Sequence, residues 1–461
     1  MRFPSSVAVL GLFALGSLAS LSAAGCGGGG ASTTSTGNGS LSLAKSSVER
    51  DPVSATSSAD LKLAVTANNA FALDLYSRVA KGTATNVLTS PISASLALTM
   101  TYAGARGTTA SQMAMALHFD PAAGSIFNGQ NALSQALAAR AASAFKLAQE
   151  QGPDPSGMVP SADDYKLDVV NSVWGETHDA WESPFLDILA KSYGTGVYLE
   201  DFASSPDPAR LAINSWVSAQ TANKINNLLG PGTLDTTTRV VLVNAIHLKF
   251  PWALPFTASQ TKPGPFTKSD GSVVQANFMN QSNFWSYVDD GQAQLVALPL
   301  TGNEIQVVFA LPHGDLPTYE AALAAGTASL DLKNLGGGYV AVQVPKMTFT
   351  SQPFELTSAL QAMGMTQAFD PSADFSGMCA HPSDSEHIYF SDVVQKSTLA
   401  LQETGVEAAA ATAVFQDAAV ADGPPPQVIL NRPFVVSIVD STTGAILFLG
   451  HIADPTDQGS P

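Results

Sequence analysis

One internal stretch limits the folds that are open to this chain. Residues 239–250, RVVLVNAIHLKF, are almost continuously apolar. Such a run suits a strand that is buried on both faces, because it lacks the polar alternation of a half-solvated strand. Residues 304–312 form another run of this kind, residues 338–349 alternate, and residues 432–450 predict two strands around a Thr-Thr-Gly turn. The second half of the chain is therefore predicted to be mostly β structure.

Helical patterns come earlier. In the range 68–80, Phe71, Leu75 and Val79 recur at helical spacing. Residues 90–113 predict a buried, small-residue helix followed by a glycine-marked turn. Further helices are predicted at 184–194 and 209–225. Helices first and strands later indicate an α+β domain in which helices pack on antiparallel sheets.

The N-terminus predicts export. Arg2 precedes an apolar stretch, residues 7–21, that is short for a bilayer span. Cys26 then follows small residues, so that residues 1–26 resemble a bacterial lipoprotein signal whose Cys is acylated. Ordinary signal cleavage near this point is the alternative. One lipid would hold the protein at a membrane surface, on the bacterial envelope with the outer membrane preferred, and an unlipidated form would be extracellular.

Residues 27–60 are rich in Gly, Ser and Thr and are predicted to be a flexible tether. Residues 61–461 then form a single domain, with residues 149–164 as a long surface loop. Cys379 is the only cysteine within that domain, so no disulfide framework exists and the core must supply the stability.

Charge and motifs argue against nucleic-acid binding and catalysis. The formal net charge is −17, from 38 acidic and 21 basic residues, and no basic stripe is present. Nucleophile-elbow, HExxH, CxxC and Walker motifs are lacking. One cluster could bind a metal, but a polar surface loop is the simpler interpretation; its members are Cys379, His381, Asp384, Glu386 and His387. We expect no metal, no cofactor and no enzymatic activity, with Cys379 a partly buried free thiol.

Residues 403–426, ETGVEAAAATAVFQDAAVADGPPP, consist mainly of small residues and contain almost no large apolar side chains that a core could bury. Alanine favours helix, but the run has neither an apolar stripe nor an N-terminal cap. It ends in Gly423 and three prolines, which terminate any helix. The segment is therefore predicted to be exposed and conformationally uncommitted, although core strands flank it.

At this point the chain resembles one family, the serpins, from about residue 61 to residue 455. The motifs that carry the resemblance follow in family order: NAFALDLY, NVLTSPISASLALTMTYAGARGTT, VVNSVWG, INSWVSAQTANKINNLL, LVNAIHLKFPWALPF, MGMTQAFDPSADFSGM, ETGVEAAAAT and NRPFVVSIVDSTTGAILFLGHIADP. The resemblance implies three mostly antiparallel sheets, about nine helices and an exposed reactive-centre loop at about 403–430.

The resemblance also implies a mechanism. A protease cleaves the loop and forms an acyl-enzyme, and the freed loop then enters the main sheet as an extra strand. The hinge residues implied are Glu403, Gly405, Val406, Glu407, Ala408, Ala409, Ala410, Ala411 and Thr412. Because strand side chains alternate, an inward Val406 places Ala408, Ala410, Thr412 and Val414 inward too, and leaves Glu407 on the solvent side.

Family spacing places the cleaved bond at Ala419–Val420. A small residue there fits an elastase-like or subtilisin-like serine protease, and a cysteine protease is a further partner class; the absence of Lys and Arg from 403–426 disfavours trypsin-like targets. The inhibitor is expected to be a monomer. The alternative is a non-inhibitory relative that keeps the fold for binding or structural purposes, although the small, uncharged inward residues of the hinge disfavour it.

Five further residues match family positions that control opening of the sheet: Ser90, Ser93, Asn244, Gln395 and Trp252. Three residues depart from the pattern. Val406 stands where Thr or Ser is usual, Thr404 replaces a common acidic residue and is expected to be exposed, and Gln395 stands where many relatives have His. We expect normal insertion with an altered strength of closure at Gln395. The simpler interpretation is that the polar members are satisfied buried groups and that Trp252 packs in the core.

Overall fold

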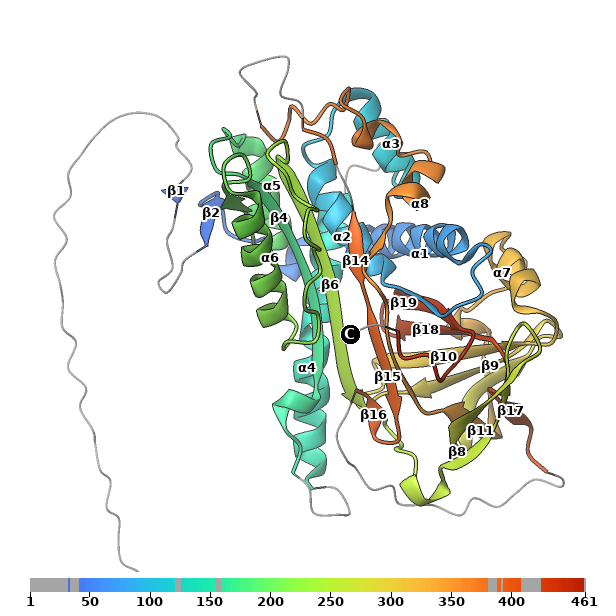
Figure 1. Cartoon of the computed structure of the whole chain (residues 1–461). Coiled ribbons are helices and arrows are strands. Elements are labelled where there is room, and N and C mark those ends of the chain that lie inside the picture. The colour runs from blue at the N-terminus through green and yellow to red at the C-terminus, as the bar shows by residue number, and fades with distance from the viewer. Residues whose placement is uncertain are drawn as a thin grey trace, which may run out of the picture.

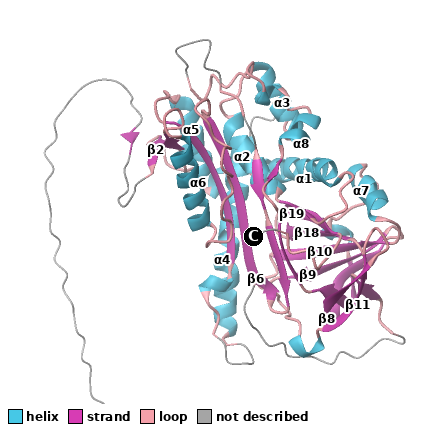
Figure 2. Cartoon of the chain, in the orientation of Figure 1, coloured by secondary structure: helices cyan, strands magenta, loops and turns pink. Residues whose placement is uncertain are grey.

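The computed structural model describes residues 32–33, 41–120, 126–153, 159–379, 388–390, 393–407 and 424–459. These residues form an α+β fold with two large sheets whose strands cross (Figures 1 and 2). The predicted fold class is confirmed. No helix among the described residues combines the length and the hydropathy needed to cross a membrane.

The described residues contain eight α-helices, where about nine were expected. Their bounds are α1 Ser58–Ala80, α2 Pro91–Tyr102, α3 Gly107–Ala116, α4 Ile126–Gln151, α5 Ser183–Tyr193, α6 Pro206–Gln220, α7 Leu316–Ala324 and α8 Thr357–Ala362. Local chemistry sets several of the ends. A capping box between Ser57 and Asp60 begins α1, and α5 ends at Gly194, whose φ of 71° suits glycine.

The first sheet has ten strands and carries the predicted hinge. Its main order is β1–β2–β5–β4–β6–β16–β15–β12, and β14 pairs with both β6 and β13. The bounds are β1 Ser32–Thr33, β2 Ser42–Lys45, β4 Lys166–Glu176, β5 Val197–Glu200, β6 Val240–Pro251, β12 Met347–Thr350, β13 Phe354–Glu355, β14 Val394–Lys396, β15 Thr398–Gln402 and β16 Gly405–Val406.

The second sheet has nine strands in the order β17–β11–β8–β9–β10–β18–β19–β3, with β7 paired to β8. The bounds are β3 Val87–Thr89, β7 Lys262–Thr267, β8 Val273–Asp289, β9 Ala293–Pro299, β10 Ile305–Pro312, β11 Gly336–Pro345, β17 Gln427–Ile429, β18 Phe434–Asp440 and β19 Ala445–Ile452. Among the described residues there are thus two hydrogen-bonded sheets rather than three. The long strand β8 pairs with β7 and β11 and also with β9, which merges two of the expected sheets into one.

Strand β6 is buried on both faces, as its apolar run predicted. Its even-numbered residues Ile246, Leu248 and Phe250 pack in the main core between the two sheets. The opposite face, with Val243 and Ala245, packs against α6, which lies over this side of the sheet (Figure 1). Since side chains alternate along a strand, each residue that joins the sheet beside β6 must also choose one of these two faces.

The segment 41–60, assigned by its composition to the tether, is packed in the described structure. Strand β2 pairs with β5, and Arg50 donates hydrogen bonds to Asn131 and Ser134 of α4. Helix α1 already begins at Ser58. Composition misjudged this segment because a four-residue strand and one half-buried guanidinium need few apolar residues.

Candidate functional site at the hinge of the ten-stranded sheet

The predicted hinge already forms part of the sheet. After β15 the chain reverses through Glu403 and Thr404, and β16 lies between β15 and β6, antiparallel to both. Val406 is opposite Leu401 on one side and Phe250 on the other. Its side chain is 2% exposed and belongs to the main core, so Val406 meets the condition from which the other inward hinge positions were predicted.

Trp252 holds the turn that precedes β16. Its backbone N–H donates to the carbonyl of Thr404 at 3.0 Å, and its indole N–H donates to the carbonyl of Gln402 at 2.8 Å. The ring is 2% exposed and meets Phe256 edge-to-face, and the N–H of Phe256 donates to the carbonyl of Glu403. Trp252 therefore packs in the core and also fixes the point at which the hinge enters the sheet.

Glu403 is the charged member of this turn. Its carboxylate accepts from the ammonium of Lys346 at 2.8 Å and from the hydroxyl of Thr261 at 2.9 Å. Burial by itself would raise the pKa of Glu403, but the hydrogen bonds from Lys346, its own backbone and Thr261 outweigh burial and lower it. The turn therefore keeps a partly buried, charged carboxylate that is anchored on two sides.

Beyond β16, the described strands β6 and β15 are not paired with each other, and this unpaired stretch of the sheet is called the slot here. Among the described residues, β15 reaches β6 only through β16, whereas β14 pairs directly with β6, with Gln395 opposite Asn244. The slot therefore runs from β16 down to β14. Continuing the antiparallel register of β16 along β6 would pair the inward hinge positions with its inner face: Ala408 with Leu248, Ala410 with Ile246, and Thr412 with Asn244.

The lower end of the slot is closed by a buried polar network. The side-chain oxygen of Gln395 accepts from the N–H of Ser90 at 2.9 Å, and its amide nitrogen donates to the Ser90 carbonyl and to Asn244 Oδ1 at 2.8 and 2.9 Å. The Asn244 amide donates to the Val394 carbonyl at 3.2 Å. The structure thus brings together Ser90, Asn244 and Gln395, which the sequence had grouped.

Ser93 lies outside that network. Its hydroxyl pairs with the side chain of Asn171 on β4, 3.0 Å away, and lies 3.5 Å from the carbonyl of Ala245. Sequence reasoning missed Asn171. The signal was present, because an amide inside the apolar strand motif VVNSVWG needs a partner in the core.

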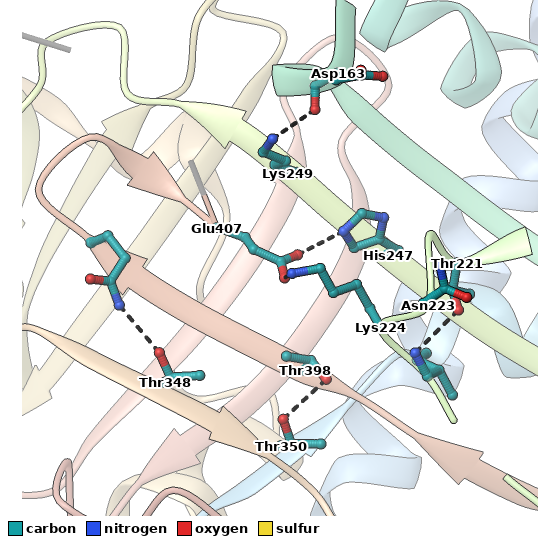
Figure 3. Close-up of polar contacts among 12 residues, drawn as sticks. Asp163, Thr221, Asn223, Lys224, His247, Lys249, Thr348, Thr350, Thr398 and Glu407 are labelled. Atoms are coloured by element: carbon teal, nitrogen blue, oxygen red, sulfur yellow. Dashed lines mark hydrogen bonds and ion pairs between the residues drawn. The ribbon is translucent and has the colours of Figure 1, made fainter. Parts of the chain in front are cut away.

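A second polar cluster at the slot was also missed, and Figure 3 shows three of its members, Lys224, His247 and Glu407. Glu407, directly after β16, lies 2.7 Å from the Nε2 of His247 on β6 and 2.5 Å from the ammonium of Lys224. The other ring nitrogen of His247 lies 3.3 Å from Asp168 on β4. The signal in the sequence was a histidine inside a continuous apolar run, which requires buried polar partners.

The cluster is charged. Burial alone would lower the pKa of His247, but hydrogen bonds to Asp168 and Glu407 outweigh burial and raise it. Burial alone would raise the pKa of Glu407, but hydrogen bonds from His247 and Lys224 outweigh burial and lower it. The imidazolium and the carboxylate each stabilise the other's charged form.

Neither Cys379 nor a second group of possible metal ligands shows the features of a reactive site. The Cys379 thiol is buried, and burial raises its pKa to about 12, as expected of an inert thiol rather than of a nucleophile. Among the described residues, Glu176, His178 and Asp201 could approach a metal ion. The two oxygens of Glu176 already accept from the N–H groups of Phe202, Ala203 and His178 and lie beside the His178 ring, so its lone pairs serve the fold.

Several predicted residues lie outside the described part of the chain. They are Cys26, the hinge positions from Ala408 to Thr412, Val414, the bond Ala419–Val420, and the residues His381, Asp384, Glu386 and His387.

A family model described as Serpin (serine protease inhibitor) matches residues 66–455. The chain belongs to the serpin family. Human Serpin B4 is 31% identical over 395 residues, which cover 84% of this chain and 98% of the relative. Bovine leukocyte elastase inhibitor is 31% identical over 401 residues, covering 84% and 98%. A serpin-like protein of Thermococcus kodakarensis is 33% identical over 399 residues, covering 86% and 87%.

Solved serpin structures agree with the fold. The thermophilic serpin tengpin in its native state superposes with a TM-score of 0.72 at 26% identity, covering 88% of this chain and 97% of tengpin. The family model is described as that of serine protease inhibitors, and the bovine relative is named as an inhibitor, so the expectation that this chain belongs to a family of inhibitors rather than of enzymes is confirmed.

Proposed function

We propose that this serpin traps a serine protease as a suicide substrate, by inserting its cleaved loop between β6 and β15. The observation that carries the proposal is the position of β16, which already occupies the top of this slot. If the register of β16 along β6 continues, the inward hinge residues are Ala408, Ala410 and Thr412, whose side chains are small enough to enter a packed interior. Bulky residues there would cost about 1–3 kcal/mol each.

Insertion can supply the work that trapping requires. About ten new ladder hydrogen bonds at roughly 0.5–1.5 kcal/mol each give about 10 kcal/mol. The protease is attached to the moving strand through its acyl bond, so it would be dragged along the sheet. A displacement of about 1 Å in a catalytic group lowers the rate ~100-fold, and deacylation would then fail.

We infer an elastase-like or subtilisin-like target. The residues at the proposed bond, Ala419 and Val420, and their neighbours Ala418 and Ala421 are all small or short, which suits a shallow specificity pocket. A relative that is 31% identical is named leukocyte elastase inhibitor. A cysteine protease remains a further target class, because it forms an acyl-enzyme of the same kind.

The test is incubation with elastase-like, subtilisin-like, trypsin-like and cysteine proteases, followed by denaturing gel electrophoresis. A boiling-resistant complex is expected with the first two, and the matched control is the same protease with its nucleophile chemically blocked. A nicked serpin without a complex for every protease would overturn the proposal. That result would favour the non-inhibitory alternative, a binding or structural protein with this fold.

For the cellular location we propose an exported protein whose Cys26 is acylated and anchors it to a bacterial envelope. The support is the sequence of residues 1–26 alone. Expression with a labelled fatty acid should give a labelled protein that partitions into detergent, and C26S should give an unlabelled protein in the aqueous phase. Equal partitioning of both forms would contradict the anchor.

A further inference from the structure

The position of Glu407 conflicts with further growth of β16. Continued in register, β16 would pair Glu407 with Lys249 and would bring Ala409 beside His247. Instead Glu407 has a φ of 55°, outside the strand region, and its carboxylate reaches His247 directly. The side chain of Glu407 therefore occupies the place beside β6 that an inserted Ala409 would need.

The second anchor comes from the segment between α6 and β6, residues 221–227. Lys224 binds Glu407, and the carbonyl of Asn226 accepts from Lys396 on β14 at 3.3 Å. The segment is thus tied to groups at both ends of the slot. Three of its residues other than glycine have positive φ values between 49° and 61°: Ala222, Asn223 and Asn227. Backbone strain of this kind persists only where the surroundings impose it.

We propose that Lys224 and His247 form a latch that holds Glu407 in the slot and stops insertion after Val406. The latch rests on the proposed function, because a stop has meaning only if the loop can insert. For insertion to proceed, Glu407 must release both partners and return to an extended conformation. Opening therefore separates two charge-assisted contacts before any new ladder hydrogen bond forms.

The electrostatic surroundings of the latch make it pH-dependent. Besides the two partners of Glu407, the groups nearby are Asp168 on β4, the exposed pair Lys166–Asp163, Lys249 with Asp164, and Lys396 on β14. Among the described residues, none of these groups contacts the carboxylate of Glu407 directly.

The sign of the pH effect follows from the two shifted pKa values. Because the pKa of His247 is raised, its protonated ring stabilises the latch fully below about pH 6.5, the ordinary value. This stabilisation is lost as the pH rises through the raised value. Because the pKa of Glu407 is lowered, its ionised carboxylate stabilises the latch fully above about pH 4.5. This stabilisation is lost as the pH falls through the lowered value. The latch should be strongest in the mildly acidic window between these two limits.

The test uses the intact, uncleaved serpin and no protease. It is held just below its melting transition, and the fraction that becomes resistant to concentrated urea is followed with time. E407Q and K224M should convert to the resistant, inserted form roughly tenfold faster than wild type, which corresponds to about 1.4 kcal/mol. The matched control is K268M, which breaks the lysine–carboxylate pair of Lys268 and Asp454, whose nearest charged atoms are 3.6 Å apart.

A pH series gives a second readout. The conversion of wild type should accelerate as the pH rises from mildly acidic to alkaline, and E407Q should lose most of this dependence. Equal rates for E407Q, K224M and K268M, including no conversion in any of them, would overturn the latch. Faster conversion of the variants without complexes on protease gels would keep the latch and reject inhibition, so the two failures are distinguishable.

Discussion

Replacement of Gln395 by alanine tests how strongly the lower end of the slot is held. Q395A removes three hydrogen bonds at once and leaves the N–H and carbonyl of Ser90 and the Oδ1 of Asn244 without those partners. All three residues are at most 1% exposed, so bulk water does not readily replace the lost amide. A buried polar atom that loses its partner costs about 1–3 kcal/mol.

The Ser90 carbonyl keeps the N–H of Ala94 as a partner, so two atoms lose theirs and predict a loss of about 2–5 kcal/mol, because partial relaxation offsets the upper end of the range. That loss is a large part of the ~5–15 kcal/mol by which a typical domain is stable. The histidine variant should recover part of it, since an imidazole offers two ring nitrogens where the amide makes three contacts. Stability is therefore expected to decrease in the order wild type, Q395H, Q395A.

The assay is urea denaturation of the intact protein, with the midpoint of the first transition converted through its m-value. Q294A is the matched control, because the amide of Gln294 makes only two weak contacts, at 3.2 and 3.4 Å, near the surface. We expect Q294A to change stability by less than about 0.5 kcal/mol. If Q395A fell within that same margin, the network would contribute nothing and the estimate would be refuted.

The remaining predictions concern the loop, the core and the thiol. A410D should abolish the boiling-resistant protease complex while cleavage continues, because the register places a carboxylate beside Ile246 in the core; a complex at wild-type yield would contradict the register. R140M should destabilise the fold by about 3–5 kcal/mol in denaturant titration, since it leaves the fully buried Asp440 without its ion pair, and a shift below about 1 kcal/mol would argue against this. Cys379 should resist thiol reagents near pH 8 in the native protein and react only after unfolding, because burial raises its pKa to about 12.

Local patterns in the sequence predicted several of the helices and strands. The apolar run at 239–250 became β6, and helical spacing predicted α1, α5 and α6 within a few residues, apart from the ten residues that α1 adds at its start. These features depend on repeats of two to four residues, which can be read directly from the local sequence. At the hinge the sequence was only partly right: Val406 is buried, but Glu407, predicted on the solvent side, has a side chain that is only 15% exposed.

Only the tertiary structure decided which polar groups meet. His247, Glu407 and Lys224 are far apart in the sequence, and nothing local to any of them predicts their contact. The same holds for Ser93, which was grouped with Gln395 but lies against Asn171. Such partners are set by how three strands and the segment after α6 pack together. A buried polar atom must find some partner, but the sequence does not say which of several distant candidates the fold brings within 3 Å.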